Sequence, residues 1–204
     1  MNTAMCPAAA GLMSDRGRGG AGAGRSRAKG GETMNTAMRL TEIRGGCCGY
    51  ETPFGFLIIE DDGEGITAIH FEGKARDLRR PSALTELAAK QLGEYFAGTR
   101  REFLLPLHPS GTEFQQSVWQ ALIRIPYGET RSYRQIAEAV GNPAACRAVG
   151  MANHCNPIPF VIPCHRVVGT NGSLTGYAGG LEMKRKLLAA EEAVCLREGE
   201  GAKG

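Results

Sequence analysis

The sequence has no segment that is apolar enough to cross a membrane. Of its 204 residues 42% are hydrophobic, but no run of about 18 consecutive apolar residues occurs among them. The apolar stretch nearest the N-terminus, residues 8–13, is weak for a secretory signal, and the residues after it do not resemble a cleaved precursor. We therefore expect no membrane partner.

The sequence also lacks the cysteine spacing of a disulfide scaffold or a zinc ribbon. It has seven cysteines, an odd number, and no two of them form a CxxC pair. This pattern argues against a secreted, disulfide-rich fold and favours reduced thiols in the cytoplasm.

The first 36 residues have too few apolar side chains to build a core. Gly, Ala, Arg and Ser dominate this stretch, so burial cannot offset chain entropy, and we expect disorder over residues 1–37. The pentapeptide MNTAM at residues 1–5 recurs at residues 34–38. The repeat indicates a duplicated start site with Met34 as the functional start, and it leaves the purpose of the preceding segment open.

Residues 38–107 are predicted to form an α/β N-terminal domain, a small sheet with one helix. Apolar runs at 54–60 and 66–71 flank a turn rich in Asp and Gly, which is typical of a hairpin. Apolar residues at helical spacing predict a helix over 84–96, and Gly98 follows as a stop signal.

Residues 112–194 are predicted to form a mainly α-helical domain with a winged-helix-like helix-turn-helix. Ser132 is placed to cap a short helix over 133–140. Asn142 is placed to cap a second helix over 144–152, across a tight turn that contains glycine. Such helix pairs bind DNA in many proteins but also serve as plain packing units.

The two predicted domains are joined by a linker and followed by a tail. Residues 106–111 contain proline and glycine, which favour an irregular connection. A final helix is expected over 181–194, and residues 195–204 are expected to form a disordered tail.

Basic side chains gather in the predicted helix-turn-helix region. Arg131, Arg134, Arg147 and Arg166 lie in one stretch whose only acidic residue is Glu138. This arrangement suits a phosphate backbone, although a solvated basic surface would show the same charge pattern.

Cys164 and His165 are the strongest candidates for chemistry in the sequence. A thiol is a good nucleophile only as thiolate, so a nearby base is needed, and a histidine polarised by a carboxylate can provide it. Because neighbouring residues of a strand point to opposite faces, a bridging water would connect the two side chains. On its own, however, a Cys-His pair is more typical of a buried structural thiol.

Several ordered motifs around this pair resemble one family, the O6-alkylguanine-DNA alkyltransferases, also called methylated-DNA–protein-cysteine methyltransferases. The resemblance covers residues 38–192 and is dense from residue 112 onward. Its motifs are Pro163–Val167 around the acceptor cysteine, Gly128–Tyr133 before the helix-turn-helix, Gly141–Pro143 and Ala145–Gly150 at the recognition helix, Asn156–Pro159 at a hinge, and Gly172–Leu181 with Lys184, Leu187 and Leu188 at the last loop and helix.

The resemblance implies a set of catalytic roles. Cys164 would accept the alkyl group, His165 would act as its base through water, and Glu191 would orient and charge-balance His165. Glu182 and Glu192 are rival carboxylates that lie off the motif register.

The resemblance also implies residues that hold the damaged base. Tyr133 would help to protonate the departing guanine, and Asn156 would brace the hinge. Tyr177, Ala178 and Val167 would line the guanine pocket.

The same resemblance implies how duplex DNA is bound. Arg147 would fill the gap left when the nucleotide is extruded, which costs roughly a few kcal/mol. The recognition helix would enter the minor groove. The small residues Ala145, Cys146 and Ala148 would permit close approach of this helix to the DNA. Phosphates would be held by other arginines, namely Arg131, Arg134 and Arg166.

The implied reaction consumes the protein. A thioether has no easy route of reversal, so one monomer would repair one double-stranded site without a cofactor. Alkyl-size preference and activity on O4-alkylthymine are left open.

Some relatives of this family hold a structural zinc in the N-terminal domain. Cys47, Cys48, His70 and His108 are the residues that could be invoked here. Adjacent cysteines are poor ligands for one tetrahedral ion, so we expect no metal.

Two other classes of protein fit the sequence less well. An alkyltransferase-like protein that binds lesions without repairing them would lack the acceptor cysteine, whereas Cys164 is present. An unrelated cysteine hydrolase would turn over and would not need a basic helix-turn-helix.

Overall fold

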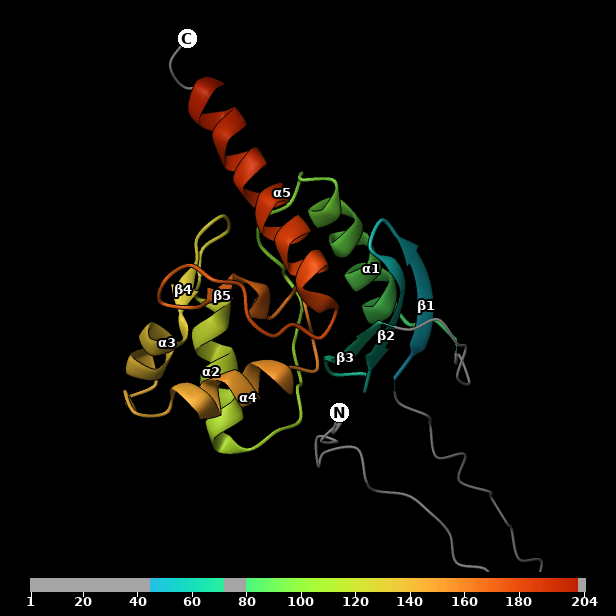
Figure 1. Cartoon of the computed structure of the whole chain (residues 1–204). Coiled ribbons are helices and arrows are strands. Elements are labelled where there is room, and N and C mark those ends of the chain that lie inside the picture. Colours follow the sequence, from blue (N-terminus) through green and yellow to red (C-terminus); the bar gives the residue numbers. More distant parts are fainter. Residues whose placement is uncertain (1–44, 72–79, 202–204) are drawn as a thin grey trace, which may run out of the picture. The chain divides into compact units, whose positions relative to one another are not determined.

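The computed structural model describes residues 45–71 and 80–201, which form a small antiparallel sheet followed by a set of helices (Figure 1). The predicted disordered segment 1–37 lies outside the described residues. In chain order the elements are β1 (Cys47–Thr52), β2 (Gly55–Asp61), β3 (Ile66–Phe71), α1 (Ala83–Phe96), α2 (Glu113–Ile123), β4 (Arg131–Ser132), α3 (Tyr133–Ala139), α4 (Cys146–His154), the 3-10 turn η2 (Cys164–Arg166), β5 (Val167–Val168) and α5 (Gly180–Gly201).

The N-terminal sheet has the order β1-β2-β3, with both neighbouring pairs antiparallel. The predicted hairpin is confirmed as β2 and β3, in which Ile59 faces Ile69. The sequence does not predict β1, because its residues show no alternation of apolar and polar side chains. β1 is placed by its hydrogen bonds to β2, from the Cys47–Glu60 pair to the Thr52–Gly55 pair.

Helix α1 is fixed to the sheet at its N-terminus and along one face. Ser82 caps the helix and forms a reciprocal capping box with Thr85. The carboxylate of Asp61 accepts hydrogen bonds from the Ser82 hydroxyl at 2.6 Å and from the Gly46 amide at 2.8 Å. The buried face of α1 includes Ala88, Leu92 and Tyr95.

The helix-turn-helix is formed by α3 and α4, and α4 packs against both α2 and α3. Ser132 caps α3 as predicted. The predicted cap at Asn142 is wrong, because its carbonyl accepts a hydrogen bond from Ala145 in a turn and α4 begins only at Cys146. The short parallel pair of β4 and β5 places the start of α3 beside the residues that follow Cys164.

Helix α5 is longer than the sequence predicts. It continues through Gly201, so most of the predicted disordered tail is helical, and within that tail only residues 202–204 lie outside the described residues. Leu187 and Val194 are buried on one side of it. Within the described residues, none of the helices is both long and apolar enough to cross a membrane.

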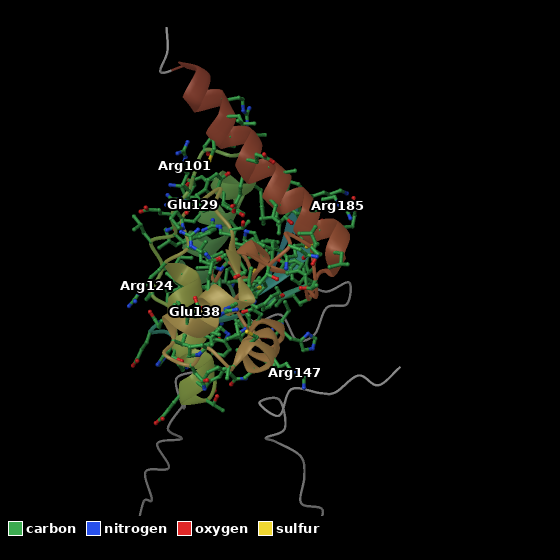
Figure 2. The ribbon with its side chains drawn as sticks, turned by 60° about the vertical axis from the view of Figure 1, so that its left-hand side comes forward. Arg101, Arg124, Glu129, Glu138, Arg147 and Arg185 are labelled. Atoms are coloured by element: carbon green, nitrogen blue, oxygen red, sulfur yellow. The ribbon has the colours of Figure 1, made fainter. Side chains whose placement is uncertain are left out.

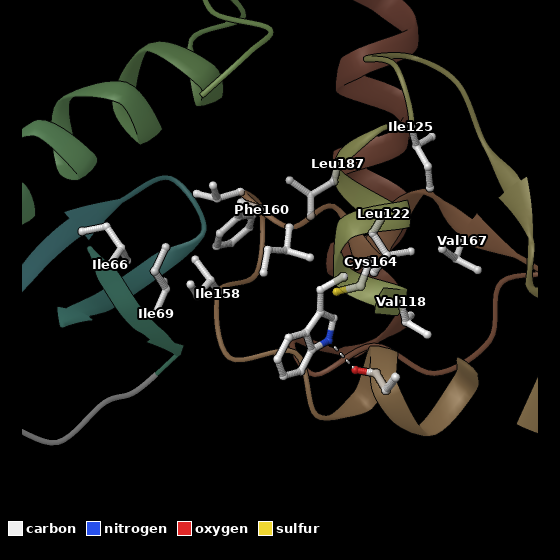
Figure 3. Packing of buried hydrophobic residues seen from close by; sticks show 14 of the residues in the cluster. Ile66, Ile69, Val118, Leu122, Ile125, Ile158, Phe160, Cys164, Val167 and Leu187 are labelled. Carbon is white, nitrogen blue, oxygen red and sulfur yellow. Dashed lines mark hydrogen bonds between the residues drawn. The ribbon is translucent and has the colours of Figure 1, made fainter. Parts of the chain in front are cut away.

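The sheet and the helices share one buried apolar cluster (Figure 3). Phe160 lies at its centre and contacts Phe71 and Phe96, with ring centroids 5.3 and 5.0 Å away. Phe160 adopts a positive φ of 70°, a conformation that non-glycine residues rarely adopt. The β3 amide of Ile69 donates to the carbonyl of Pro157 at 2.8 Å. The segment before Cys164 is therefore held from both the sheet and the helices.

Candidate active site

Cys164 lies in the 3-10 turn η2 rather than in the strand that the sequence suggested. Its amide donates to Ile162 at 2.8 Å, and the Arg166 amide donates to Pro163 at 3.0 Å. The residue is 5% exposed, and its sulfur lies among apolar side chains (Figure 3). The turn changes the geometry between Cys164 and His165, because consecutive residues of a turn do not point to opposite faces.

Asn156 is the polar side chain in direct contact with the sulfur. Its Nδ2 lies 3.1 Å from Cys164 Sγ and donates to the Ile162 carbonyl at 2.8 Å. Its Oδ1 accepts from the Ile158 amide at 3.0 Å. Asn156 therefore braces this segment and also directs a donor at the Cys164 sulfur.

Glu191 is the carboxylate that faces His165. The distance from His165 Nε2 to Glu191 Oε1 is 3.0 Å, and both side chains are fully buried. The rival residues lie elsewhere: Glu182 pairs with Arg185 on the surface, and Glu192 is exposed.

Glu191 is the centre of a larger buried network. Its two oxygens accept from Arg166 Nε and Nη2 at 2.9–3.2 Å, from the Gly128 amide at 3.0 Å and from the Tyr95 hydroxyl at 2.6 Å. Burial opposes ionisation of this carboxyl, but its contacts with His165 and Arg166 outweigh burial and lower its pKa to about 2. Glu191 is therefore a carboxylate, and it only accepts hydrogen bonds.

The network determines which nitrogen of His165 carries the proton. Since Glu191 can only accept, Nε2 must donate to it, which leaves a lone pair on Nδ1. No protein group within the described residues bonds this Nδ1. Burial lowers the pKa of His165 below its usual value, so the ring is neutral near pH 7. His165 is therefore poised to accept a proton at Nδ1.

The Cys164 sulfur is a thiol in this structure rather than the thiolate that nucleophilic attack requires. Burial raises its pKa above the usual range, and the opposing effects of Asn156 and Lys184 are smaller. Ionisation must therefore be coupled to proton transfer.

Lys184 is a buried cation whose role sequence reasoning missed. Its Nζ donates to the carbonyls of Val167 at 2.6 Å and Thr175 at 2.9 Å, and its charge favours ionisation of Cys164. The spacing of residues in the sequence could have indicated this burial. Lys184, Leu187 and Glu191 recur at helical spacing on the buried side of α5. Ionisable residues in an apolar register indicate a buried charge.

Among the residues expected to hold the base, Tyr177 and Ala178 lie in the segment Thr175–Ala178, and Tyr133 contacts it. The Tyr133 hydroxyl contacts the Thr175 hydroxyl at 3.2 Å. The Tyr177 ring lies 6.4 Å from the His165 ring, and its buried hydroxyl has no hydrogen-bond partner within the described residues. Val167 is fully buried.

Two hollows flank that segment. One, of about 330 Å³, is lined by Asn156 and Ala178 together with residues of the sheet. The other, of about 310 Å³, is lined by Tyr133, Thr175 and residues of α4. Ala178 lines the first and Tyr133 the second, and Cys164 lines neither of them.

The outer face of α4 carries the predicted DNA-binding residues. Arg147 and Ala148 are exposed, and Ala145 and Cys146 are half-buried. Figure 2 shows Arg147 extending outward from α4, on a different side from Arg124. Small side chains on this face leave room for a close approach.

Arg131, Arg134 and Arg166 were expected to hold phosphates, and each of them pairs with an acidic side chain instead of standing free. Arg131 pairs with Glu129 at 2.7 Å and Arg134 pairs with Glu138 at 3.0 Å, so their charges are partly balanced. Arg166 is 5% exposed and binds Glu191. The prediction that Arg166 contacts phosphate is wrong, because its guanidinium lies inside the protein.

The residues considered for zinc do not form a metal site. His108 pairs with Asp62, and His70 lies 3.7 Å from Glu60. In residues 45–71 and 80–201, no three His, Cys, Asp or Glu side chains are grouped to hold a metal.

Comparison with known proteins accounts for both halves of this fold. Residues 48–109 match the family model of the 6-O-methylguanine DNA methyltransferase ribonuclease-like domain, and residues 113–193 match that of its DNA-binding domain.

Individual relatives are similar over most of their length. The methylated-DNA–protein-cysteine methyltransferase of Methanosarcina acetivorans is 48% identical over 70% of this chain and 95% of its own. The constitutive enzyme of Bacillus subtilis is 50% identical over 69% and 92%. The crystal structure of Mycobacterium tuberculosis OGT in complex with DNA matches with a TM-score of 0.67 and 44% identity, over 72% of this chain and 92% of that one. The chain therefore belongs to the 6-O-methylguanine DNA methyltransferase family, and it matches both of the family's domain models.

Proposed function

We propose that this protein repairs DNA by moving the alkyl group of O6-alkylguanine onto the sulfur of Cys164. The observation that carries the proposal is a pair of contacts on consecutive buried residues, Asn156 with Cys164 and Glu191 with His165, in a member of this family. A thiol beside a neutral histidine that a carboxylate orients supports this proposal, because activation of a thiol requires a base of this kind.

The proton of Cys164 goes to His165 Nδ1, directly or through one water. The sulfur then attacks the alkyl carbon, an S–C bond forms, and the C–O6 bond breaks with its electron pair going to the guanine oxygen. The guanine gains one proton, so a thiol and an alkyl ether become a thioether and an ordinary guanine. The imidazolium formed on the way is stabilised by Glu191, and Lys184 stabilises the sulfur anion.

Tyr133 is the proposed donor to the departing guanine. A leaving group that is protonated as it leaves carries less charge, and a phenol can supply that proton. The phenolate then regains a proton from solvent, and the imidazolium of His165 releases its proton to solvent. In this structure the hydroxyl is held against Thr175. Because Thr175–Ala178 lies between the two hollows, we propose that this segment shifts to let an extruded base reach Cys164.

The partner that this site requires is duplex DNA containing an O6-alkylated guanine. Arg147, Ala148 and their neighbours on α4 are proposed to enter the minor groove, with Arg131 and Arg134 toward phosphates. We further propose that the protein acts as a monomer, without a cofactor, in the cytoplasm. The odd cysteine count without framework spacing supports that location.

Whole-protein mass spectrometry tests the proposed reaction. Stoichiometric protein is mixed with a duplex that contains O6-methylguanine, and the intact protein and its peptides are weighed. We expect one adduct per molecule, on the Cys164 peptide, with the mass of one CH₂, and repair that stops when the protein is used up. Many turnovers would point to a hydrolase, and binding without an adduct would point to a lesion-binding protein.

Arg147 offers a test of base extrusion. Arg147→Ala should slow repair of duplex DNA about 10-fold to 100-fold. Extrusion of the nucleotide costs a few kcal/mol, and in this variant no arginine side chain fills the gap in the stack to offset that cost. Reaction with free O6-benzylguanine should hardly change, since that substrate needs no extrusion. Arg185→Ala is the matched control, because Arg185 lies on the exposed side of α5 and pairs with Glu182. Equal slowing with both substrates would contradict a role in extrusion.

A further inference from the structure

Tyr95 connects the N-terminal domain to the proposed proton acceptor. It lies near the end of α1, within the ribonuclease-like domain, which holds none of the site residues that the sequence predicts. Its ring is 4% exposed. Its hydroxyl reaches Glu191 of α5, which lies 96 residues later in the chain. Figure 1 shows α1 and α5 side by side.

The Tyr95 hydroxyl has only one way to satisfy its neighbours. It lies 2.6 Å from Glu191 Oε1 and 3.2 Å from His165 Nε2. The carboxylate can only accept, so the phenol proton belongs to Glu191. The phenol oxygen then presents a lone pair toward Nε2. Both groups that face Nε2 are therefore acceptors.

We propose that Tyr95 is a positioning residue for alkyl transfer, one that holds Glu191 and His165 so that Nε2 keeps its proton and Nδ1 receives the proton of Cys164. The inference deepens the proposed function and rests on it. Tyr95 touches neither the sulfur nor the expected position of the base, so it acts through Glu191 and His165.

The surroundings of Tyr95 keep its hydroxyl in place. Its ring centroid lies 5.3 Å from that of Phe103, 5.5 Å from that of Phe96 and 6.0 Å from that of Tyr127. Burial, together with the charge of Glu191, raises its pKa well above the usual value, so the phenol stays a donor across the working range of pH. A rigid ring with a permanent proton suits an orienting role.

Several titratable groups act on the pair formed by His165 and Glu191. Glu191 is faced by Tyr95 from α1, by Arg166 from η2 and, at longer range, by Tyr127. The remaining groups that influence His165, Tyr127 or the sulfur are Lys184, Cys164, Tyr177, Cys195 and Arg101. Tyr95 is the uncharged member that contacts both partners of the pair, so its hydroxyl can be removed without changing the net charge of the network.

The variant Tyr95→Phe keeps the ring and removes the hydroxyl. Glu191 then loses a donor and becomes more basic, which stabilises the imidazolium and raises the pKa of His165. The plateau rate of Cys164 alkylation by O6-benzylguanine should fall about 10-fold. Losses of this size are seen in metal sites when a residue that orients a metal-binding side chain is removed. The acid limb of the rate–pH profile should move to higher pH. Both quantities are measured from pH 5 to 9 on the full chain by whole-protein mass spectrometry.

Tyr127→Phe is the matched control. It removes the hydroxyl of the neighbouring ring, which in the described structure bonds neither Glu191 nor His165, and it should keep the wild-type profile. A Tyr95→Phe protein with an unchanged rate and profile would overturn the proposal. So would a loss of rate that is equal at every pH, because that is what a packing defect alone produces.

A measurement on the wild-type protein makes the proposal testable even where the variant does not fold. ¹⁵N NMR of His165 should show a protonated Nε2 and an unprotonated Nδ1 at pH 7. A proton on Nδ1 would overturn the role assigned to Tyr95. Failure of the proposed function is distinguishable, because the wild-type protein would then form no adduct on Cys164 at all.

Discussion

Cys164→Ala is expected to abolish alkyl transfer and to leave a folded protein that still binds duplex DNA. The rate should fall by at least about 10⁴-fold, the scale seen when an enzyme loses its nucleophile. Folding should survive, because the thiol is a neutral, buried group and alanine fills much of the same space. The measurements are the mass of the intact protein after incubation with O6-methylguanine DNA and a binding titration with the same duplex.

Cys48→Ala is the control for this variant. Cys48 lies on β1, away from α4, η2 and α5, so its loss should change neither transfer nor binding. An adduct that persists in Cys164→Ala at the wild-type rate would show that another thiol is the acceptor. Loss of DNA binding together with transfer would mean that the substitution had unfolded the C-terminal domain.

The side chains that contact Cys164 and His165 could be predicted because motifs specify their places in the sequence. Pro163, Cys164 and His165 are consecutive, and Glu191 stands at a defined position on a helix whose apolar spacing is plain. The structure places the predicted Asn156 and Glu191 within hydrogen-bond distance of Cys164 and His165, respectively. Their functional roles remain proposals that the variants test.

The fate of Arg166 could not be predicted, because a sequence shows charge and not burial. Arg131, Arg134, Arg147 and Arg166 look alike as members of one basic stretch. Only the fold shows that Arg166 turns inward, binds Glu191 and donates to the Ile125 carbonyl at 2.7 Å. A basic stretch predicts a phosphate site only for those side chains that reach solvent.

Contacts between distant parts of the chain were equally hidden. Tyr95 fits the apolar face of its helix, so periodicity predicts it as core, and nothing local marks its hydroxyl as a partner of Glu191. β1 is placed by pairing with β2 and not by its own pattern. The start of α4 depends on the turn closed between Asn142 and Ala145, which competes with the cap that the residue types favour.

Glu191→Gln should impair both the stability and the reaction of the protein. Arg166 would lose its buried counter-charge, and the free energy of unfolding should fall by about 3 kcal/mol. At about 2–4 °C per kcal/mol for a domain of this size, Tm should fall by roughly 10 °C. The glutamine amide can also donate toward His165 Nε2, which favours the wrong tautomer, and transfer should slow by about 10³-fold. Calorimetry and the rate of adduct formation with O6-benzylguanine measure the two effects.

Acid titration separates the contribution of Glu191 from general damage to the fold. Its pKa in the folded protein is about 2, below the ordinary value of 4.5. The stabilisation from this carboxylate is therefore complete above about pH 4.5 and is lost as the pH falls through about 2. Burial also lowers the pKa of His165, so a further loss begins as the pH falls below the ordinary histidine range. The wild-type protein should lose stability in both pH windows. Glu191→Gln should not show the loss between pH 4.5 and 2, because glutamine does not titrate.

Glu192→Gln and Glu182→Gln are the matched controls, because the sequence offers these carboxylates as rivals to Glu191. Both lie on the exposed side of α5, and Glu182 pairs with Arg185 and Lys186 at the surface. Surface pairs contribute about 0–1 kcal/mol, so Tm and the transfer rate should stay near wild type in both variants. If either control lost transfer while Glu191→Gln kept it, the carboxylate that supports His165 would have been misassigned. If Glu191→Gln lost stability but transferred at the wild-type rate, Glu191 would serve only as the counter-charge of Arg166, and the base would act without it.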